Sequence, residues 1–132
     1  IIDIKNCIDL GPVLFSFSSL KYGATFINTK RLQIKESNRI LAMKEELIKV
    51  GSNVIIKENE VIVTPIKKDI SNNICFNSHN DHRIVMASAV ASIIARNDVT
   101  ITDSQAINKS YPDFFGDFKK LGGNVNVINN RW

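Results

Sequence analysis

A charged turn followed by an apolar segment decides the fold: Ser78-His79-Asn80-Asp81-His82-Arg83-Ile84 leads directly into the largely apolar residues 85–94. Asp81 is a residue type that commonly caps helices, so a helix is predicted from here to about Arg96. An acid, an imidazole and a guanidinium therefore stand at the start of a buried helix, where charge is unfavourable without a partner. This position suggests a binding or catalytic role.

On both sides of this turn, strand-like and helical stretches alternate. Alternating apolar and β-branched runs predict strands at 2–7, 24–28, 53–57, 61–64, 74–77, 99–102 and 124–128, with a hairpin over 53–64 and a polar linker over 67–73. Helical periodicity and end signals predict further helices over 9–21, 35–51 and 109–122. Asp9 is the predicted cap of the first helix, with Pro12 in its first turn, and Ser110 and Asp113 have the spacing of a capping box.

The two halves of the chain resemble each other at an offset of about 70 residues. Asp9 corresponds to Asp81, and residues 47–54 correspond to 118–125. This similarity predicts an α/β protein in which one β-α-β-α-β unit occurs twice, over about residues 1–66 and 67–132. Chance self-similarity within an alternating chain is the competing interpretation.

Composition indicates a single soluble domain. Of 132 residues, 44% are hydrophobic and 23% are charged, which excludes disordered and fibrous classes. The net charge of +4 favours an anionic ligand, but the basic residues are scattered and do not alternate with aromatic ones, so nucleic-acid binding is not predicted. Cys7 and Cys75 lack metal-site spacing and fit reduced thiols in a cytoplasmic protein. The sequence shows no signal peptide and no membrane-spanning segment.

Cationic residues recur at three predicted helix starts. Arg39, His82 and Arg83 lie in or beside first turns, and Lys35 and Lys109 lie just ahead of a first turn. The positive end of the helix dipole disfavours these charges unless an anion binds there as well. Several converging cations suit a ligand with carboxylate and phosphate groups. The competing interpretation is that each of them is a solvated surface residue.

Carboxylates accompany these cations. Asp9 and Asp81 are explained as helix caps, and for Asp9 a role as a base competes with that explanation. Glu36 is either a first-turn acid that offsets the dipole or an acid–base group. His82 is most simply a ring packed at a helix start and hydrogen-bonded to a neighbour. No second His or Cys stands at ligand spacing, so a metal site is not predicted.

Four motifs together resemble one known family, that of enolpyruvylshikimate-phosphate synthase: Asp9-Leu10-Gly11-Pro12, Lys35-Glu36-Ser37-Asn38-Arg39-Ile40, Asn80-Asp81-His82-Arg83-Ile84 and Lys109-Ser110-Tyr111-Pro112-Asp113-Phe114-Phe115. The resemblance implies two domains, each an inside-out α/β barrel of three βαβαββ units, with substrates between them. This chain would be two of the three units of one domain. It also begins at Ile1 without Met, so we expect an upstream, N-terminal part of the same enzyme as its partner, and inactivity without it.

The resemblance further implies transfer of the enolpyruvyl group of phosphoenolpyruvate to the 5-hydroxyl of shikimate 3-phosphate, without metal or organic cofactor. Asp9 would accept a proton near that hydroxyl, and Lys35 would contact the shikimate substrate and take part in proton transfer. Glu36 would exchange a proton with the methylene carbon, and His82 would orient the site.

Four further residues would bind substrate according to the same resemblance. Arg39 and Arg83 would hold the carboxylate of phosphoenolpyruvate and Lys109 its phosphate, while Arg31 would contact shikimate 3-phosphate. The sequence departs from the family pattern at Ile8, Gln33, Asn38 and Tyr111, none of which has a predicted role in proton transfer. The related UDP-N-acetylglucosamine enolpyruvyltransferases match less well, and a non-catalytic anion-binding module of the same fold is a further alternative.

Overall fold

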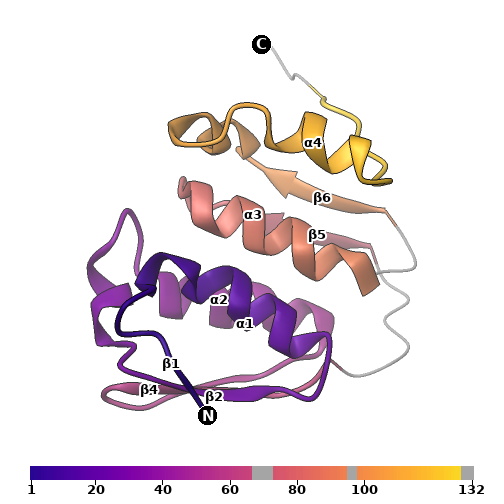
Figure 1. Cartoon of the computed structure of the whole chain (residues 1–132). Helices are drawn as coiled ribbons and strands as arrows, with labels where there is room; N and C mark the ends of the chain where they lie inside the picture. Colours follow the sequence, from indigo (N-terminus) through magenta and orange to yellow (C-terminus); the bar gives the residue numbers. More distant parts are fainter. Residues whose placement is uncertain (67–72, 95–97, 129–132) are drawn as a thin grey trace.

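The structure, a computed structural model, describes residues 1–66, 73–94 and 98–128 (Figure 1). The predicted linker over 67–73 and the predicted end of the helix at Arg96 fall largely outside these ranges. Within them, no helix has the length and apolar character needed to cross a membrane.

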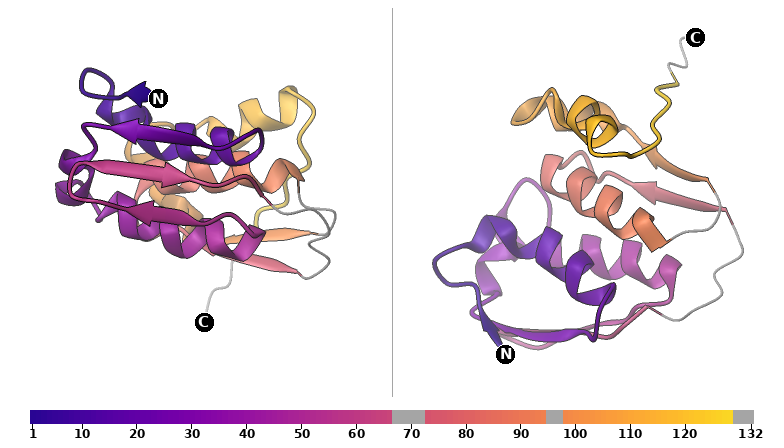
Figure 2. Two further views of the ribbon diagram at one scale, coloured as in Figure 1. Left: turned by 90° about the horizontal axis from the view of Figure 1, so that it is seen from below. Right: turned by 45° about the vertical axis from the view of Figure 1, so that its right-hand side comes forward.

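The first half of the chain forms a four-stranded sheet in the order β1-β2-β4-β3. Its strands are β1 (Ile2–Asp3), β2 (Ala24–Ile27), β3 (Val54–Ile56) and β4 (Glu60–Val63). β1 pairs with β2 in parallel, and the other pairs are antiparallel, so the predicted hairpin is confirmed. Seen from below, these strands lie side by side with helices behind them (Figure 2, left). β1 is shorter than predicted because the chain turns at Ile4–Cys7.

Two helices cover one face of this sheet, α1 (Gly11–Ser19) and α2 (Arg39–Leu47). Short 3-10 helices precede them, η1 (Ile8–Leu10) and η2 (Lys30–Ile34), and η3 (Ile48–Val50) extends α2. The predicted periodicity of α2 is confirmed, since Ile40, Met43 and Leu47 are buried. Gly51, at φ 83°, ends this segment in the left-handed conformation that glycine adopts without penalty.

The second half contributes α3 (His82–Ala91), extended by η4 (Ser92–Ile94), and a parallel pair of strands, β5 (Ile74–Asn77) and β6 (Val99–Thr102). α3 packs along α1 (Figure 1), where the Ser16 hydroxyl donates to the Ala87 carbonyl at 2.7 Å. One apolar core joins both halves, since it includes Phe15 and Phe26 together with Phe76 and Ile84. The remaining labelled elements, η5 (Ser104–Lys109) and α4 (Phe114–Lys120), lie on the far side of α3 from α1 and α2 (Figure 1), and η5 packs against α3.

Three sequence predictions are wrong. Asp9 does not cap α1, because it already lies in the 3-10 turn η1 and Leu10 is the residue before the helix. Ser110 and Asp113 do not form a capping box, since no side-chain cap bond is present at α4. Residues 123–128 form no strand, and the two sheets, of four and of two strands, do not by themselves confirm the predicted repeat. Apolar alternation forms a strand only where a neighbouring strand accepts its hydrogen bonds.

Candidate functional site

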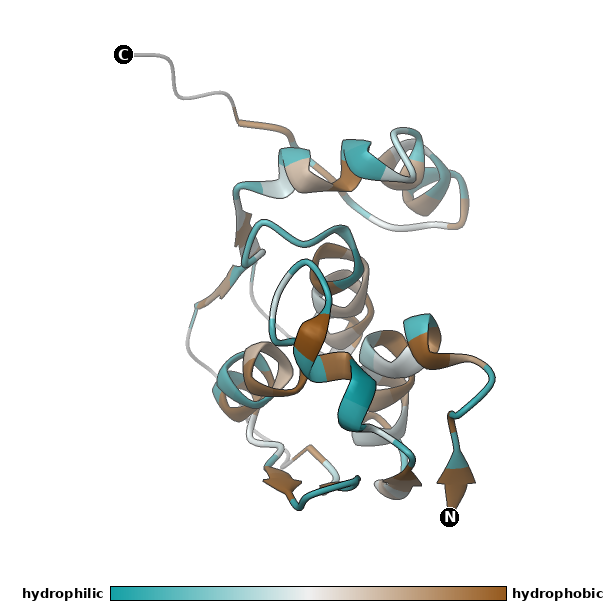
Figure 3. Cartoon of the chain, turned by 90° about the vertical axis from the view of Figure 1, so that its left-hand side faces the viewer, coloured by the Kyte–Doolittle hydropathy of each residue, from teal (hydrophilic) through white to brown (hydrophobic). Residues whose placement is uncertain are grey.

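The predicted site residues gather where three helices begin. Arg39 opens α2, Asp81 precedes α3, and Asp9 lies in η1 just before α1. Figure 3 looks onto this side of the molecule. Because the side chains of these residues contact one another, segments far apart in the sequence share a single polar cluster.

Arg39 is the centre of this cluster and is 1% exposed. Its Nε donates to Asp81 Oδ2 at 2.8 Å and its Nη2 to Asp81 Oδ1 at 3.2 Å, a two-point contact. Its Nη1 donates to Asp9 Oδ1 at 3.1 Å, and its Nη2 also contacts the Glu36 carboxylate. The prediction left open whether Arg39 is a solvated surface residue, and its burial excludes that interpretation.

Opposite charges hold this buried pair in its ionised form. Burial alone would lower the pKa of Arg39, but Asp81, Glu36 and Asp9 outweigh burial and raise it. Burial would likewise raise the pKa of Asp81, but hydrogen bonds from Arg39, Ser37 and the backbone N–H of Arg83 lower it below its ordinary value.

Asp81 has two tasks. Its Oδ1 accepts the backbone N–H of Arg83 at 2.9 Å, so the predicted cap of α3 is confirmed. The same carboxylate binds Arg39 and accepts the Ser37 hydroxyl at 2.7 Å. Sequence reasoning missed this second role and gave Ser37, which stands in one of the four motifs, no role of its own. The helical period carried a signal, because Arg39 lies four residues before buried Met43 and hence on the apolar face of α2.

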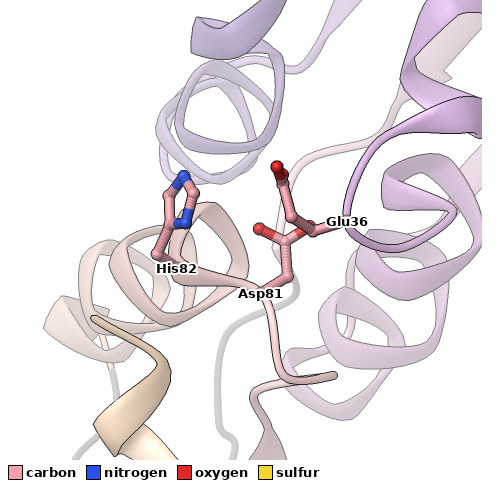
Figure 4. Close-up of side chains that lie close together, drawn as sticks. All are labelled: Glu36, Asp81 and His82. Atoms are coloured by element: carbon pink, nitrogen blue, oxygen red, sulfur yellow. The ribbon is translucent and has the colours of Figure 1, made fainter. Parts of the chain in front are cut away.

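Glu36, Asp81 and His82 lie close together, with one ligand atom of each within 4.8 Å of the others (Figure 4). A metal ion is not favoured here, because both oxygens of Asp81 already accept hydrogen bonds and the Arg39 cation is adjacent. Two buried nitrogens, Nδ1 of His82 and Nε of Arg83, have no hydrogen-bond partner within the described ranges. Such groups favour a polar ligand.

The remaining predicted residues lie around this cluster. Lys35 Nζ is 3.7 Å from Asp9 Oδ1. Lys109, at the end of η5, does not reach the acids and donates to the Asn80 carbonyl at 2.5 Å. Exposed Arg31 and Asp9 line the same open depression. The other residues that line this depression are Lys5, Asn6, Cys7, Ile8 and Leu10.

The cluster as a whole is only weakly cationic. Together with the predicted residues around it, it has five cationic side chains and three carboxylates, namely Arg31, Lys35, Arg39, Arg83 and Lys109 against Asp9, Glu36 and Asp81. A ligand with several negative charges would need further cations for tight binding. The chain is therefore an α/β protein in which acidic and cationic side chains lie close together at the starts of three helices.

Comparison with known proteins identifies its family. The sequence profile of EPSP synthase (3-phosphoshikimate 1-carboxyvinyltransferase) matches residues 1–118. The 3-phosphoshikimate 1-carboxyvinyltransferases of Clostridium botulinum (strain Alaska E43 / Type E3) and Clostridioides difficile are 43% and 41% identical over 130 residues, which is 98% of this chain and 30% of each relative. The chain belongs to the EPSP synthase family, and the predicted family resemblance is confirmed.

Solved structures agree with this assignment. One EPSP synthase structure from Acinetobacter baumannii aligns with a TM-score of 0.78 at 27% identity, covering 90% of this chain and 28% of that one. A second from the same organism aligns with a TM-score of 0.80 at 24% identity and supports the fold. The chain thus spans less than a third of the length of the relatives it matches, and the predicted α/β class is confirmed.

Proposed function

We propose that this chain is the C-terminal portion of a cytoplasmic shikimate-pathway enzyme that transfers the enolpyruvyl group of phosphoenolpyruvate to the 5-hydroxyl of shikimate 3-phosphate and releases phosphate. It would supply two of the three βαβαββ units of one domain, over about residues 1–66 and 67–132. The observation that carries the proposal is the convergence of Asp9, Lys35, Glu36 and Arg39 at one point, beside unpartnered nitrogens of His82 and Arg83.

The proposed proton transfers use the groups around Arg39. Asp9 would accept the proton of the attacking hydroxyl; its half-exposed carboxylate, 3.7 Å from Lys35 Nζ, supports this role. Glu36, also half-exposed, would exchange a proton with the methylene carbon. Both carboxylates contact the Arg39 guanidinium. If the substrate carboxylate takes over part of that guanidinium, Glu36 is released for proton exchange.

The proposed anion contacts use Arg39 together with three further cations, Arg83, Lys109 and Arg31. Arg83 would hold the carboxylate of phosphoenolpyruvate together with Arg39, and Lys109 would hold its phosphate. Arg31, beside Asp9 in the same depression, would contact shikimate 3-phosphate. The near balance of charge in this cluster supports the need for a partner, since two multiply charged substrates would require cations from the rest of the enzyme.

A chimaeric enzyme tests the proposal. This chain replaces the matching 130 residues of the Clostridium botulinum relative, and phosphate release is measured with phosphoenolpyruvate and shikimate 3-phosphate. We expect turnover by the chimaera and none by this chain alone. A chimaera that melts cooperatively and binds phosphoenolpyruvate without turnover would instead support the non-catalytic module, and turnover by the isolated chain would contradict the requirement for a partner.

Replacing Arg83 by Ala in this chimaera is expected to weaken phosphoenolpyruvate binding by about 1.5–3 kcal/mol, the value of a charge-assisted hydrogen bond. The neighbouring Arg31→Ala change is the matched control, since its predicted contact is to the other substrate. Calorimetric titration with phosphoenolpyruvate measures both. If Arg83→Ala leaves the affinity for phosphoenolpyruvate unchanged, Arg83 does not bind this substrate and is a solvated surface residue.

A further inference from the structure

A second polar cluster, around buried Glu46, lies further along α2 from the candidate site. Glu46, on α2, is 2% exposed, and its carboxylate accepts Lys49 Nζ at 2.7 Å and the backbone N–H of Asn77 at 2.8 Å through Oε1. Its Oε2 lies 2.7 Å from Nε2 of His79. Burial would raise the pKa of Glu46, but Lys49, Asn77 and His79 lower it below its ordinary value. Glu46 is thus a buried anion tied to the turn that follows β5.

This turn, residues 77–81, has a demanding backbone. His79 and Asn80 have φ values of 53° and 52°, in the left-handed region that costs an ordinary residue about 1–2 kcal/mol. Local bonds help to hold the turn, since the His79 N–H donates to Asn77 Oδ1 at 2.8 Å and the Asp81 N–H donates to the Ser78 carbonyl at 3.0 Å. Two consecutive left-handed residues persist where the surroundings fix them.

Helix α2 fixes the turn at two places. Arg39 binds Asp81 at the end of the turn, and Glu46 binds His79 and Asn77 at its beginning. Residues seven apart lie on the same helical face, about 10 Å from each other along the axis. Side chains of α2 therefore hold both ends of the turn. The α2 residue is a cation, Arg39, at one end and an anion, Glu46, at the other.

We infer that Glu46 and His79 are positioning residues, which set the direction in which His82 and Arg83 enter the site. The inference rests on the proposed function. The pair of Arg39 with Asp81 fixes the end of the turn. Local bonds and Lys109 hold residues 78–80, and Glu46 is the contact that fastens the beginning of the turn to α2. Loss of that contact lets the start of α3 shift against α2, and a displacement of about 1 Å is enough to weaken a positioned contact severely.

A metal site is a weaker explanation of the same residues. Glu45, Glu46 and His79 do bring ligand atoms within 4.8 Å of one another. However, the Lys49 ammonium already occupies one oxygen of Glu46, and the backbone N–H of Asn77 shares it. Oε2 of Glu45 is 3.6 Å from Nε2 of His79, and the Glu45 side chain is 65% exposed. This exposed neighbour therefore serves as a control for Glu46.

The first test compares Glu46→Gln with Glu45→Gln in the chimaeric enzyme. Both changes remove one carboxylate beside His79, but only the first replaces a buried carboxylate. The single oxygen of the new amide cannot accept from His79 on one side and from Lys49 and Asn77 on the other. We expect the KM for phosphoenolpyruvate to rise about tenfold in Glu46→Gln, with the KM for shikimate 3-phosphate unchanged and Glu45→Gln like the parent. A parent without turnover would contradict the proposed function. A parent with turnover and equal KM values in both variants would contradict the positioning role alone.

The second test separates positioning from stability at His79. Asn suits the left-handed backbone but is too short to reach Glu46, whereas Gln can donate to it through its amide. We expect His79→Asn to raise the KM for phosphoenolpyruvate as Glu46→Gln does, and His79→Gln to retain the parental value. If Glu46→Gln and His79→Asn lower the melting temperature while leaving both KM values unchanged, the residues are structural only and the inference is wrong.

Discussion

Replacing Asp81 by Asn is expected to lower the free energy of unfolding of this chain by about 3–5 kcal/mol, because it leaves the buried Arg39 cation without its closest counter-charge. Asn caps helices as well as Asp does, so the change removes the charge while keeping the start of α3 intact. Asp9 and Glu36 cannot compensate fully, since both are half-exposed and their attraction is weakened by water. Urea denaturation followed by circular dichroism measures the loss.

The matched control is Asp9→Asn, which removes a carboxylate from the same guanidinium. Because the side chain of Asp9 is 53% exposed, we expect a loss of less than about 1 kcal/mol. Equal losses from the two substitutions would show that burial of the Arg39–Asp81 pair is not what makes it important. A gain in stability in Asp81→Asn would contradict the described pairing outright.

The pH dependence of stability gives an independent measurement of the same pair. The pKa of Asp81 is lowered in the folded state, so its stabilising effect is complete above the unfolded value of about 3.9 and is lost as the pH falls through the folded value. The parental chain should therefore lose stability below about pH 4 more steeply than Asp81→Asn. Glu46, whose pKa is also lowered, contributes to the slope that remains in the variant.

The local elements of the fold were largely accessible from the sequence. Apolar spacing located α2, and the charged turn with the apolar segment behind it located α3, because period and caps are properties of a few consecutive residues. The strand predicted over 124–128 failed for the opposite reason. Val125 and Val127 alternate with Asn, but a strand also requires a partner, and that requirement is not written in the segment itself.

The sequence predicted which residues form the candidate site, but not which of them contact one another. Asp9, Glu36 and Arg39 were all singled out as charges at helix starts, and the structure brings them together. That Arg39 would be buried against Asp81 depends on how α2 packs beside α3, a contact across 42 residues of sequence. Glu46 escaped notice for the same reason, since its partners lie in another element.

Replacing Glu36 by Gln in the chimaeric enzyme is expected to reduce kcat by about 10²- to 10⁴-fold, the range that a positioned acid–base group contributes. Gln keeps the shape and can still accept a hydrogen bond from Arg39, but it cannot exchange a proton with the methylene carbon. The pair with Arg39 is half-exposed on the Glu36 side, so its loss should cost less than about 1 kcal/mol of stability. Turnover and thermal melting of the same preparation measure both quantities.

Glu60→Gln is the control for this prediction, because it removes a carboxylate that has no proposed role in proton transfer. Glu60, partly exposed on β4, forms an ion pair with exposed Lys57 at 3.5 Å. This pair has the same three-residue spacing as Glu36 and Arg39. The two variants therefore lose comparable surface charge, and only one loses a proposed proton carrier. A kcat within tenfold of the parent in Glu36→Gln would remove Glu36 from the mechanism. Its contact with Arg39 would then be only an ion pair that the substrate carboxylate displaces on binding.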